Sequence, residues 1–403
     1  MRQLRKAGPA ALAGVGAAVL AVSLSACVTG PGPAKAAPGT GAPAVSTAAV
    51  GATTPADRDD HARTRTVARR MARTVRIPWR ALAHADAIAV AGNRVWVANA
   101  SYGASGWLAE IDAATGALVR IVAGQRYGLS DPVALAADGN TLWVADGTGN
   151  AVTEVNAMTG ALIRVIAGHG YQLADPEAIA AGGGHVWAVS AGANSVTEID
   201  AATGALVRVI SAPRYRLDTT VYPPAIAVAD GRVWVTDGNS DALTEIDAAT
   251  GALVRVITDR RYQLNGPDAI AVADGRAWVV SVDSSSVTET DAATGALIRV
   301  IPRLPNVPFG IVSGSGGAWL LTNLGVKAVD GARPDGSVAE LSAASGRLVK
   351  NIGGPPFRAA APGGEIAAGS GGIWVTGTNF YTYRAWLAEL SATTGALLRV
   401  IVG

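Results

Sequence analysis

Short apolar runs recur in pairs along the chain from about residue 86 to residue 402. In one unit, the run that begins at Ala269 is followed by Asp274-Gly275 and then by Arg276-Ala-Trp-Val-Val. Apolar runs on either side of an Asp-Gly turn predict two antiparallel strands joined by a tight hairpin. Because side chains alternate between the two faces of a strand and the runs are apolar at successive positions, we expect both faces to be buried.

A tryptophan lies in the second predicted strand of each unit. These residues are Trp96, Trp143, Trp187, Trp234, Trp278, Trp319 and Trp374. Their spacing is 41 to 55 residues, a period typical of β-propellers built from four-stranded blades. The sequence therefore predicts an all-β fold, a seven-bladed β-propeller with four antiparallel strands per blade. Each tryptophan is expected to fill the space between neighbouring blades.

A second regularity marks the last two predicted strands of each unit, which are joined by a turn containing Thr-Gly or, once, Ser-Gly. The turn glycines are Gly116, Gly160, Gly204, Gly251, Gly295, Gly346 and Gly395. In every unit a Glu on the third strand precedes a cation on the fourth by ten residues: Glu110 and Arg120, Glu154 and Arg164, Glu198 and Arg208, Glu245 and Arg255, Glu289 and Arg299, Glu340 and Lys350, Glu389 and Arg399. This offset places the two charges opposite one another across the hairpin, where a pair contributes about 0.2 to 1 kcal/mol. We interpret the pairs as structural rather than catalytic.

The N-terminus has the pattern of an export signal. Arg2, Arg5 and Lys6 precede an apolar stretch from residue 7 to residue 24, and small residues follow. Leu24-Ser25-Ala26-Cys27 resembles the lipobox of bacterial lipoproteins, in which the cysteine is acylated and becomes the first mature residue. Cys27 is the single cysteine of the chain. We expect a signal peptide over residues 1–26 and a lipid anchor on Cys27; the alternative is an ordinary cleavage site beside an incidental cysteine.

Between the anchor and the repeats the composition changes twice. Residues 28 to 55 are mostly Ala, Gly, Pro, Thr and Ser, and residues 57 to 76 are rich in arginine. Neither stretch has enough large apolar residues for a core, so residues 27–80 are expected to form a flexible tether and residues 81–403 the propeller. The arginines could lie on anionic lipid or keep a solvated tether extended. Residues 73 to 77 also resemble a fourth strand, so the way in which the ring closes stays open.

Charge is divided between the two parts of the chain. Residues 1 to 80 hold 12 Lys and Arg against 3 Asp, whereas residues 81 to 403 hold 21 against 28 Asp and Glu. An acidic body argues against a nucleic-acid partner, because phosphate binding depends on clustered cations. No cofactor motif is present, and a metal site has little support: Asp237 to Asp241 begins like a calcium loop, but Ala242 and Ala248 stand at its sixth and twelfth positions.

The repeat also resembles a known family. Val-Trp-Val-Thr-Asp near Trp234, the following Thr-Glu-Ile-Asp-Ala-Ala-Thr-Gly and Gly-Pro-Asp-Ala-Ile-Ala-Val near Asp268 are similar to the YVTN and NHL families of β-propeller repeats. The resemblance covers about 320 residues and implies a surface or extracellular binding module. Streptogramin lyases have similar repeats and use a histidine, acidic partners and a metal; this chain offers no matching set of residues.

Candidate ligand-binding residues lie in the loops that share one face around the central channel of such a fold. They are Tyr127, Asp131, Asp146, Tyr171, Asp175, Glu177, Tyr215, Asp237, Tyr262 and Asp268. Together they predict an acidic funnel with an aromatic rim. The alternative is that the tyrosines pack each loop onto its blade and that the aspartates serve turn geometry.

The sequence thus favours a lipid-anchored extracytoplasmic propeller on a bacterial cell membrane. It would act without a cofactor and bind a protein, peptide or polysaccharide of the envelope, or serve as a scaffold for an envelope complex. A second hypothesis is a propeller enzyme of the streptogramin-lyase or hydrolase type that uses His169 and a carboxylate. The sequence assigns no catalytic residue. Blade 6, which has an insertion from residue 325 to residue 335, and blade 7 depart from the repeat.

Overall fold

A computed structural model describes residues 72–100, 105–218, 223–314, 316–323, 336–354, 356–357, 364–378 and 384–403. The signal peptide, Cys27, the tether up to residue 71 and the insertion of blade 6 lie outside the described residues, so these expectations stay predictions. None of the helices in the described part is long and apolar enough to cross a membrane.

The described residues form seven sheets, each of four consecutive antiparallel strands, and one sheet carries a fifth strand. The predicted all-β seven-bladed propeller is therefore confirmed. The first strands of blades 1 to 7 are β2 (Ala87–Ala91), β6 (Pro132–Asp138), β10 (Pro176–Gly182), β14 (Ile226–Ala229), β18 (Pro267–Ala273), β22 (Val307–Gly314) and β26 (Ile366–Gly369). The second strands are β3 (Arg94–Asn99), β7 (Thr141–Asp146), β11 (His185–Ser190), β15 (Arg232–Asp237), β19 (Arg276–Ser281), β23 (Gly317–Asn323) and β27 (Gly372–Thr378).

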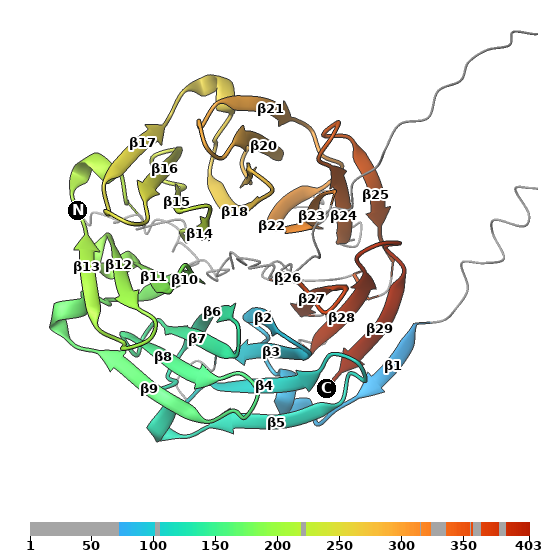
Figure 1. Cartoon of the computed structure of the whole chain (residues 1–403). Helices are drawn as coiled ribbons and strands as arrows, with labels where there is room; N and C mark the ends of the chain where they lie inside the picture. Colours follow the sequence, from blue (N-terminus) through green and yellow to red (C-terminus); the bar gives the residue numbers. More distant parts are fainter. Residues whose placement is uncertain are drawn as a thin grey trace, which may run out of the picture. The chain divides into compact units, whose positions relative to one another are not determined.

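The outer half of each blade is a second hairpin. The third strands are β4 (Trp107–Asp112), β8 (Ala151–Asn156), β12 (Ser195–Asp200), β16 (Ala242–Asp247), β20 (Ser286–Asp291), β24 (Ser337–Ser342) and β28 (Ala385–Ser391). The fourth strands are β5 (Leu118–Ala123), β9 (Leu162–Ala167), β13 (Leu206–Ile210), β17 (Leu253–Ile257), β21 (Leu297–Ile301), β25 (Leu348–Ile352) and β29 (Leu397–Val402). First strands of successive blades contact one another from β2 round to β26, and β26 contacts β2, so the seven blades close a ring around the first strands (Figure 1).

One row of side chains crosses every blade. In blade 4, Ala227 pairs with Trp234, Trp234 with Glu245, and Glu245 with Arg255. The Glu and the cation pair in the same register in all seven blades, as their ten-residue offset predicts. The seven tryptophans are at most 2% exposed, and Trp96 donates from Nε1 to the Ala157 carbonyl of the next blade. The tryptophans therefore do fill the space between blades.

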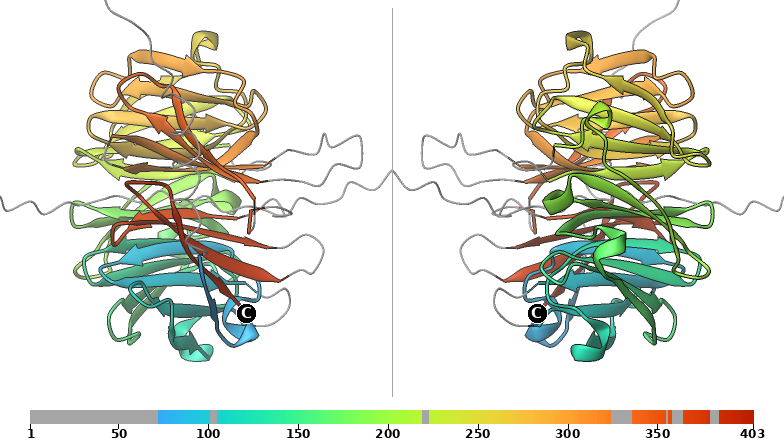
Figure 2. Two further views of the ribbon diagram at one scale, coloured as in Figure 1. Left: turned by 90° about the vertical axis from the view of Figure 1, so that its right-hand side faces the viewer. Right: turned by 90° about the vertical axis from the view of Figure 1, so that its left-hand side faces the viewer.

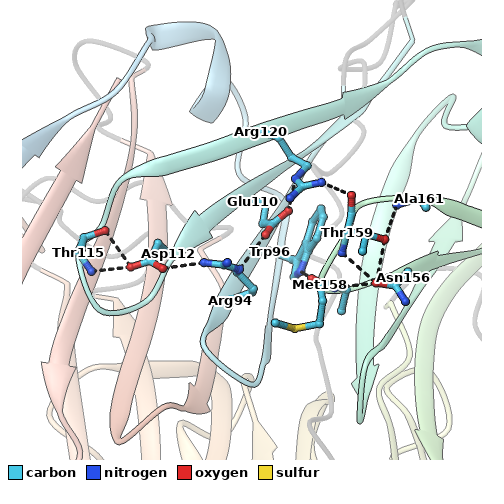
Figure 3. Close-up of polar contacts among 11 residues, drawn as sticks. Arg94, Trp96, Glu110, Asp112, Thr115, Arg120, Asn156, Met158, Thr159 and Ala161 are labelled. Atoms are coloured by element: carbon cyan, nitrogen blue, oxygen red, sulfur yellow. Dashed lines mark hydrogen bonds and ion pairs between the residues drawn. The ribbon is translucent and has the colours of Figure 1, made fainter.

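The cation of the fourth strand joins two blades. Arg120 contacts its own Glu110 through Nε at 2.7 Å and donates to the Thr159 carbonyl in the outer turn of the next blade (Figure 3). Arg164 reaches Ala202 O at 2.9 Å and Arg208 reaches Ala249 O at 3.1 Å in the same way. Glu110, Glu198, Glu245 and Glu289 are fully buried, so the expected contribution of about 0.2 to 1 kcal/mol, which is typical of exposed pairs, is too small: a desolvated carboxylate without its cation would be far more costly.

The outer turn requires glycine for a physical reason. Gly251 has φ +69°, in the left-handed region that favours glycine, and a Cβ there would lie 2.5 Å from Cδ of Arg208 in the preceding blade. Gly160, Gly204 and Gly295 are packed against the preceding Arg in the same way. The repeated glycine thus lets the arginine reach the turn carbonyl.

The fifth strand resolves how the ring closes. β1 (Arg73–Arg76) pairs in parallel with β29, from Arg73 opposite Arg399 to Arg76 opposite Val402. The Ile77 amide then donates to Val402 O, and the Val75 side chain lies near the outer turn of blade 1 at Gly116. Blade 7 keeps its own four strands, so β1 is added outside them. The sheet of blade 7 therefore includes Arg73–Arg76, which lie within the segment that the sequence predicted to be tether.

The loops divide between two faces of the ring, since the strands run from one face to the other (Figure 2). We call the face with the two hairpin turns of each blade the turn face. The mouth face carries the loops between second and third strands and those that lead from a fourth strand to the next blade. Because β1 is parallel to β29, which starts at a hairpin turn, the chain reaches Arg73 on the turn face.

Candidate functional site

The mouth face carries short one-turn helices. Five of them lie in loops that lead to the first strand of a blade, and a sixth lies between the second and third strands of one blade. They are η1 (Trp79–Leu82), η2 (Gln125–Tyr127), η3 (His169–Tyr171), η5 (Pro213–Tyr215) and η6 (Arg260–Tyr262), together with η4 (Ala191–Ala193) inside blade 3. All of the predicted site residues lie in these loops or at the strand ends beside them. The structure therefore brings them to one face, but it gives them different roles.

The four predicted tyrosines attach each loop to the following blade. Their hydroxyls donate to the turn glycines: Tyr127 to Gly160, Tyr171 to Gly204, Tyr215 to Gly251 and Tyr262 to Gly295, all at 2.9 to 3.0 Å. Three rings are buried, and only that of Tyr171 is partly exposed. The expected aromatic rim is thus not formed by the three buried rings, because each lies between its loop and the next blade.

Asp146 and Asp237 end second strands and hold backbone amides. Asp146 accepts from the amides of Ser130 at 2.7 Å and Asp131 at 2.5 Å. Asp237 accepts from those of Asp218, Asn239 and Ser240 at 2.9 to 3.0 Å. These bonds fasten the incoming loop to the second strand, as the turn-geometry alternative predicts. Both carboxylates are buried, so they shape the mouth face rather than line its surface.

Glu177 and Asp268 occupy the same place in blades 3 and 5. Each follows a proline at the start of a first strand, and the strand register shifts there: between Pro176 and Ala178, and between Pro267 and Ala269. Each is therefore the extra residue of a β-bulge, which re-aims a side chain. Burial raises the pKa of both carboxyls to about 7, helped by the nearby charges of Asp175 and Asp283 respectively.

Carboxylates also gather across blades 1 to 3. Burial raises the pKa of Asp86 to about 7, and the charge of Asp131 adds to the rise. Burial also raises the pKa of Asp131, and the charges of Asp146 and Asp175 raise it further. The Asp175 Oδ1 and Asp131 Oδ2 atoms both approach Gly147, at 3.1 and 3.6 Å from the place of a Cβ. No cation contributes to the pKa of Asp86, Asp131 or Glu177 within the described part of the chain. Asp86, Asp131, Asp175 and Glu177 therefore form an acidic cluster in which neighbouring carboxylates repel one another.

His169 lies apart from this cluster. It is exposed on η3, which contacts β13, an outermost strand, whereas the carboxylates stand at the start of innermost strands. Across the described ranges, no group of three or more His, Cys, Asp or Glu side chains is arranged to hold a metal ion. The structure therefore does not bring His169 together with the carboxylates.

A hollow of about 630 Å³ lies farther out on the mouth face, between loops of blades 4 and 5. Its lining includes Arg216, Asp241, Asp259, Arg260, Gln263 and Asn265. Because both signs of charge line it, this hollow does not extend the acidic cluster.

Asp86, Ser190 and Ser281 also belong to this face, although they were not among the site residues predicted from the sequence. Asp86 accepts from the Ala100 amide at 2.8 Å, while Ser190 and Ser281 end second strands opposite Pro176 and Pro267. Aligning the repeats on Ala-Ile-Ala would have placed Asp86 beside Glu177 and Asp268. The sequence carries no signal for the buried serines, because serine is common in such loops.

Comparison with known proteins supports the fold alone. The sequence matches no protein-family model and no curated protein. Among solved structures, the computationally designed Ika8 protein is 18% identical with a TM-score of 0.54, covering 78% of this chain and 85% of its own. The RRP9 WD40 repeats are 10% identical with a TM-score of 0.55, covering 72% and 86%. Hydrazine synthase of Kuenenia stuttgartiensis is 17% identical with a TM-score of 0.50, covering 62% and 74%. The chain is thus a β-propeller similar in architecture to WD40 propellers.

Proposed function

We propose that this protein is a lipid-anchored extracytoplasmic binding module of the YVTN/NHL type, and that it binds a cationic segment of a peptide or protein at the mouth face. The observation that carries the proposal is the acidic cluster formed by Asp86, Asp131, Asp175 and Glu177, together with Asp268 in blade 5. Burial and mutual repulsion raise the pKa of four of these carboxyls. A cationic ligand would relieve this repulsion, so its binding is favoured electrostatically.

The position of β1 fits anchoring at Cys27. The chain reaches β1 on the turn face, opposite the acidic cluster. A tether that joins the ring there leaves the mouth face open to a partner. The enzyme hypothesis has less support, because His169 and the carboxylates stand at different radii of the ring.

Binding of a hepta-lysine peptide to the full chain in neutral detergent tests the proposal. Charge reversal by Asp131→Lys, Asp175→Lys and Asp268→Lys together should abolish binding, because three attractive charges become repulsive. The control reverses Asp138, Asp230 and Asp274, which stand in hairpin turns of the turn face. Equal loss of binding in the two triple variants would show only a net-charge effect and would contradict the proposed site.

The anchor is tested separately. Cells that express the full chain are labelled with a palmitate analogue, and the protein should take up the label. Cys27→Ala should abolish the label, because Cys27 carries the only thiol of the chain. Label that persists in this variant would show that acylation occurs elsewhere or that the signal is an ordinary one.

A further inference from the structure

Blades 3 and 5 share an arrangement of polar groups where the first and second strands meet the mouth face. In each blade a bulged carboxylate follows the proline that pairs with the serine at the end of the second strand: Glu177 with Ser190, and Asp268 with Ser281. Ser190 pairs directly with Pro176, and Ser281 pairs directly with Pro267, so each serine is opposite the residue that precedes the carboxylate. The other blades place Asn99, Asp146, Asp237, Asn323 and Thr378 at the end of the second strand.

The two serine hydroxyls are buried, with no partner among the described residues. Ser190 and Ser281 are 0% exposed, and neither Oγ has a hydrogen-bond partner within the described ranges. A buried hydroxyl without a partner costs free energy, so such groups are rare unless something else binds them. By contrast, the neighbouring hydroxyls are engaged: Ser195 donates to Gln172 O at 3.4 Å, and Ser286 bonds to Ser284 at 2.8 Å.

The two carboxylates likewise have no partner in the part of the chain that the structure describes. Asp268 is only 8% exposed, and no hydrogen bond or cation from the described residues acts on its carboxyl group or on that of Glu177. Asp86, the equivalent acid of blade 1, differs because the Ala100 amide binds it. Blades 3 and 5 therefore each present one acidic and one hydroxyl oxygen acceptor that the described part of the protein leaves unsatisfied.

We propose that these pairs, Glu177 with Ser190 and Asp268 with Ser281, are two primary-ammonium sites of the mouth face, which take the amino groups of lysine side chains or of other alkylamines. This inference rests on the proposed function and names the chemical group that the acidic face recognises. An ammonium group supplies three N–H donors to the carboxylate and the hydroxyl, and its charge neutralises the carboxylate.

Other cations fit these sites less well. A calcium ion needs six to eight oxygen ligands, whereas the described residues hold no group of three metal-binding side chains. A guanidinium binds best when it meets both oxygens of an open carboxylate in one plane, and Asp268 is too deeply buried to offer that. A compact ammonium on a thin alkyl chain suits the nearly buried acceptors of blade 5 and also the half-buried Glu177 of blade 3.

The test titrates the full chain in neutral detergent with ethylammonium chloride and, as a matched control, tetramethylammonium chloride, and measures each dissociation constant by NMR. Tetramethylammonium has the same charge but no N–H donor. We expect ethylammonium to bind at least about tenfold more tightly and at two sites. Glu177→Gln and Asp268→Asn should each remove one site, and the double variant should remove both, whereas Asp274→Asn in a hairpin turn of blade 5 should change nothing.

The paired Ser190→Ala and Ser281→Ala variant separates hydrogen bonding from charge. It removes only two hydroxyl groups, so the fold should be kept, and we expect the dissociation constant of ethylammonium to rise about fivefold while that of tetramethylammonium is unchanged. Equal binding of the two cations, or ethylammonium binding that survives in the double carboxylate variant, would overturn the inference. If hepta-lysine binds the mouth face but ethylammonium does not, the proposed function stands and the ammonium sites fail. If neither binds, both fail.

Discussion

At the scale of single residues, stability depends on buried charge as well as on apolar packing. Glu245 is fully buried between Arg232 on the second strand and Arg255 on the fourth, with Nε to carboxylate distances of 3.0 and 2.7 Å. Burial raises the pKa of Glu245, and the two guanidinium groups oppose the rise. These ion pairs therefore stabilise the fold only while the carboxylate and the guanidinium groups are all charged, because a single buried charge would be left without compensation.

Glu245→Gln should lower the free energy of unfolding by about 2 kcal/mol, since it leaves the half-buried Arg255 without its counter-ion and Arg232 with Asp247 alone. Asp274→Asn, at an exposed turn position, should change it by less than about 0.5 kcal/mol. Urea unfolding followed by tryptophan fluorescence measures both. Equal stability of the two variants would mean that the buried pairs contribute nothing net.

Tyr215 and Tyr171 make the same kind of hydrogen bond at different solvent exposure of the side chain. Both donate to a turn glycine of the next blade, but Tyr215 is buried whereas Tyr171 is partly exposed. Tyr215→Phe should therefore cost about 1 kcal/mol, and Tyr171→Phe should cost less because water can replace the partner. Unfolding midpoints in urea report the difference; the reverse order would show that these bonds do not hold the loops.

At the scale of elements, β1 is the part of the ring with the fewest supports. It pairs through four residues with one edge of β29, and its burial depends mainly on Val75 and Ile77. A short strand at a sheet edge opens more easily than the rest of a sheet. The same edge is free on the fourth strands of the other blades, where β-branched side chains such as Ile163, Val207 and Ile298 are exposed.

Val75→Asp should release β1, because it places a charge beside Ile401 and the Gly116 turn. Hydrogen exchange should then rise at the amide of Ile77, which bonds to Val402 O, and stay unchanged in blades 2 to 6. Thr74→Ser, at a neighbouring exposed position, is the control. Exchange that rises throughout the ring would show instead that β1 is needed for closure of the whole propeller.

Much of this fold could be predicted from the sequence, because each blade repeats the same physical requirements. The Trp, the Glu–cation offset and the turn glycine recur together and fix four strands per blade. Ring closure could not be predicted, since residues 73 to 77 and the end of the chain both resemble a fourth strand. The burial of Tyr127, Tyr215 and Tyr262 agrees with one of the two alternatives that the sequence left open, because spacing places them in a loop without showing which blade the ring faces. The bulges at Glu177 and Asp268 depend on strand register, which a single sequence does not reveal.

At the scale of the whole molecule, carboxyls with a raised pKa make stability depend on pH. Asp86, Glu177 and Asp268 titrate near 7 when folded, against a usual value near 4. Between these values the native state binds more protons than the unfolded chain, so the free energy of unfolding falls as pH rises. Asp112, Asp200, Asp247 and Asp291 have a lowered pKa and lose their contribution only below about pH 4.

The melting temperature should therefore be higher at pH 5.5 than at pH 8 at constant ionic strength. In the Glu177→Gln, Asp268→Asn double variant the difference should shrink, because two of the titrating groups are gone. Differential scanning fluorimetry across this range gives the comparison. A melting temperature that rises from pH 5.5 to pH 8 would show that these carboxyls are paired in solution.

Binding of a cationic partner at the mouth face is tested most directly by footprinting the carboxyl groups with a diazo ester, which esterifies them without activating them toward lysine amines, in the presence and absence of hepta-lysine. Modification of each Asp and Glu is read by mass spectrometry. The peptide should protect Asp131, Asp175 and Glu177 and leave Asp138, Asp230 and Asp274 of the turn face as reactive as before. Protection confined to the turn face, or spread evenly over both faces, would contradict it.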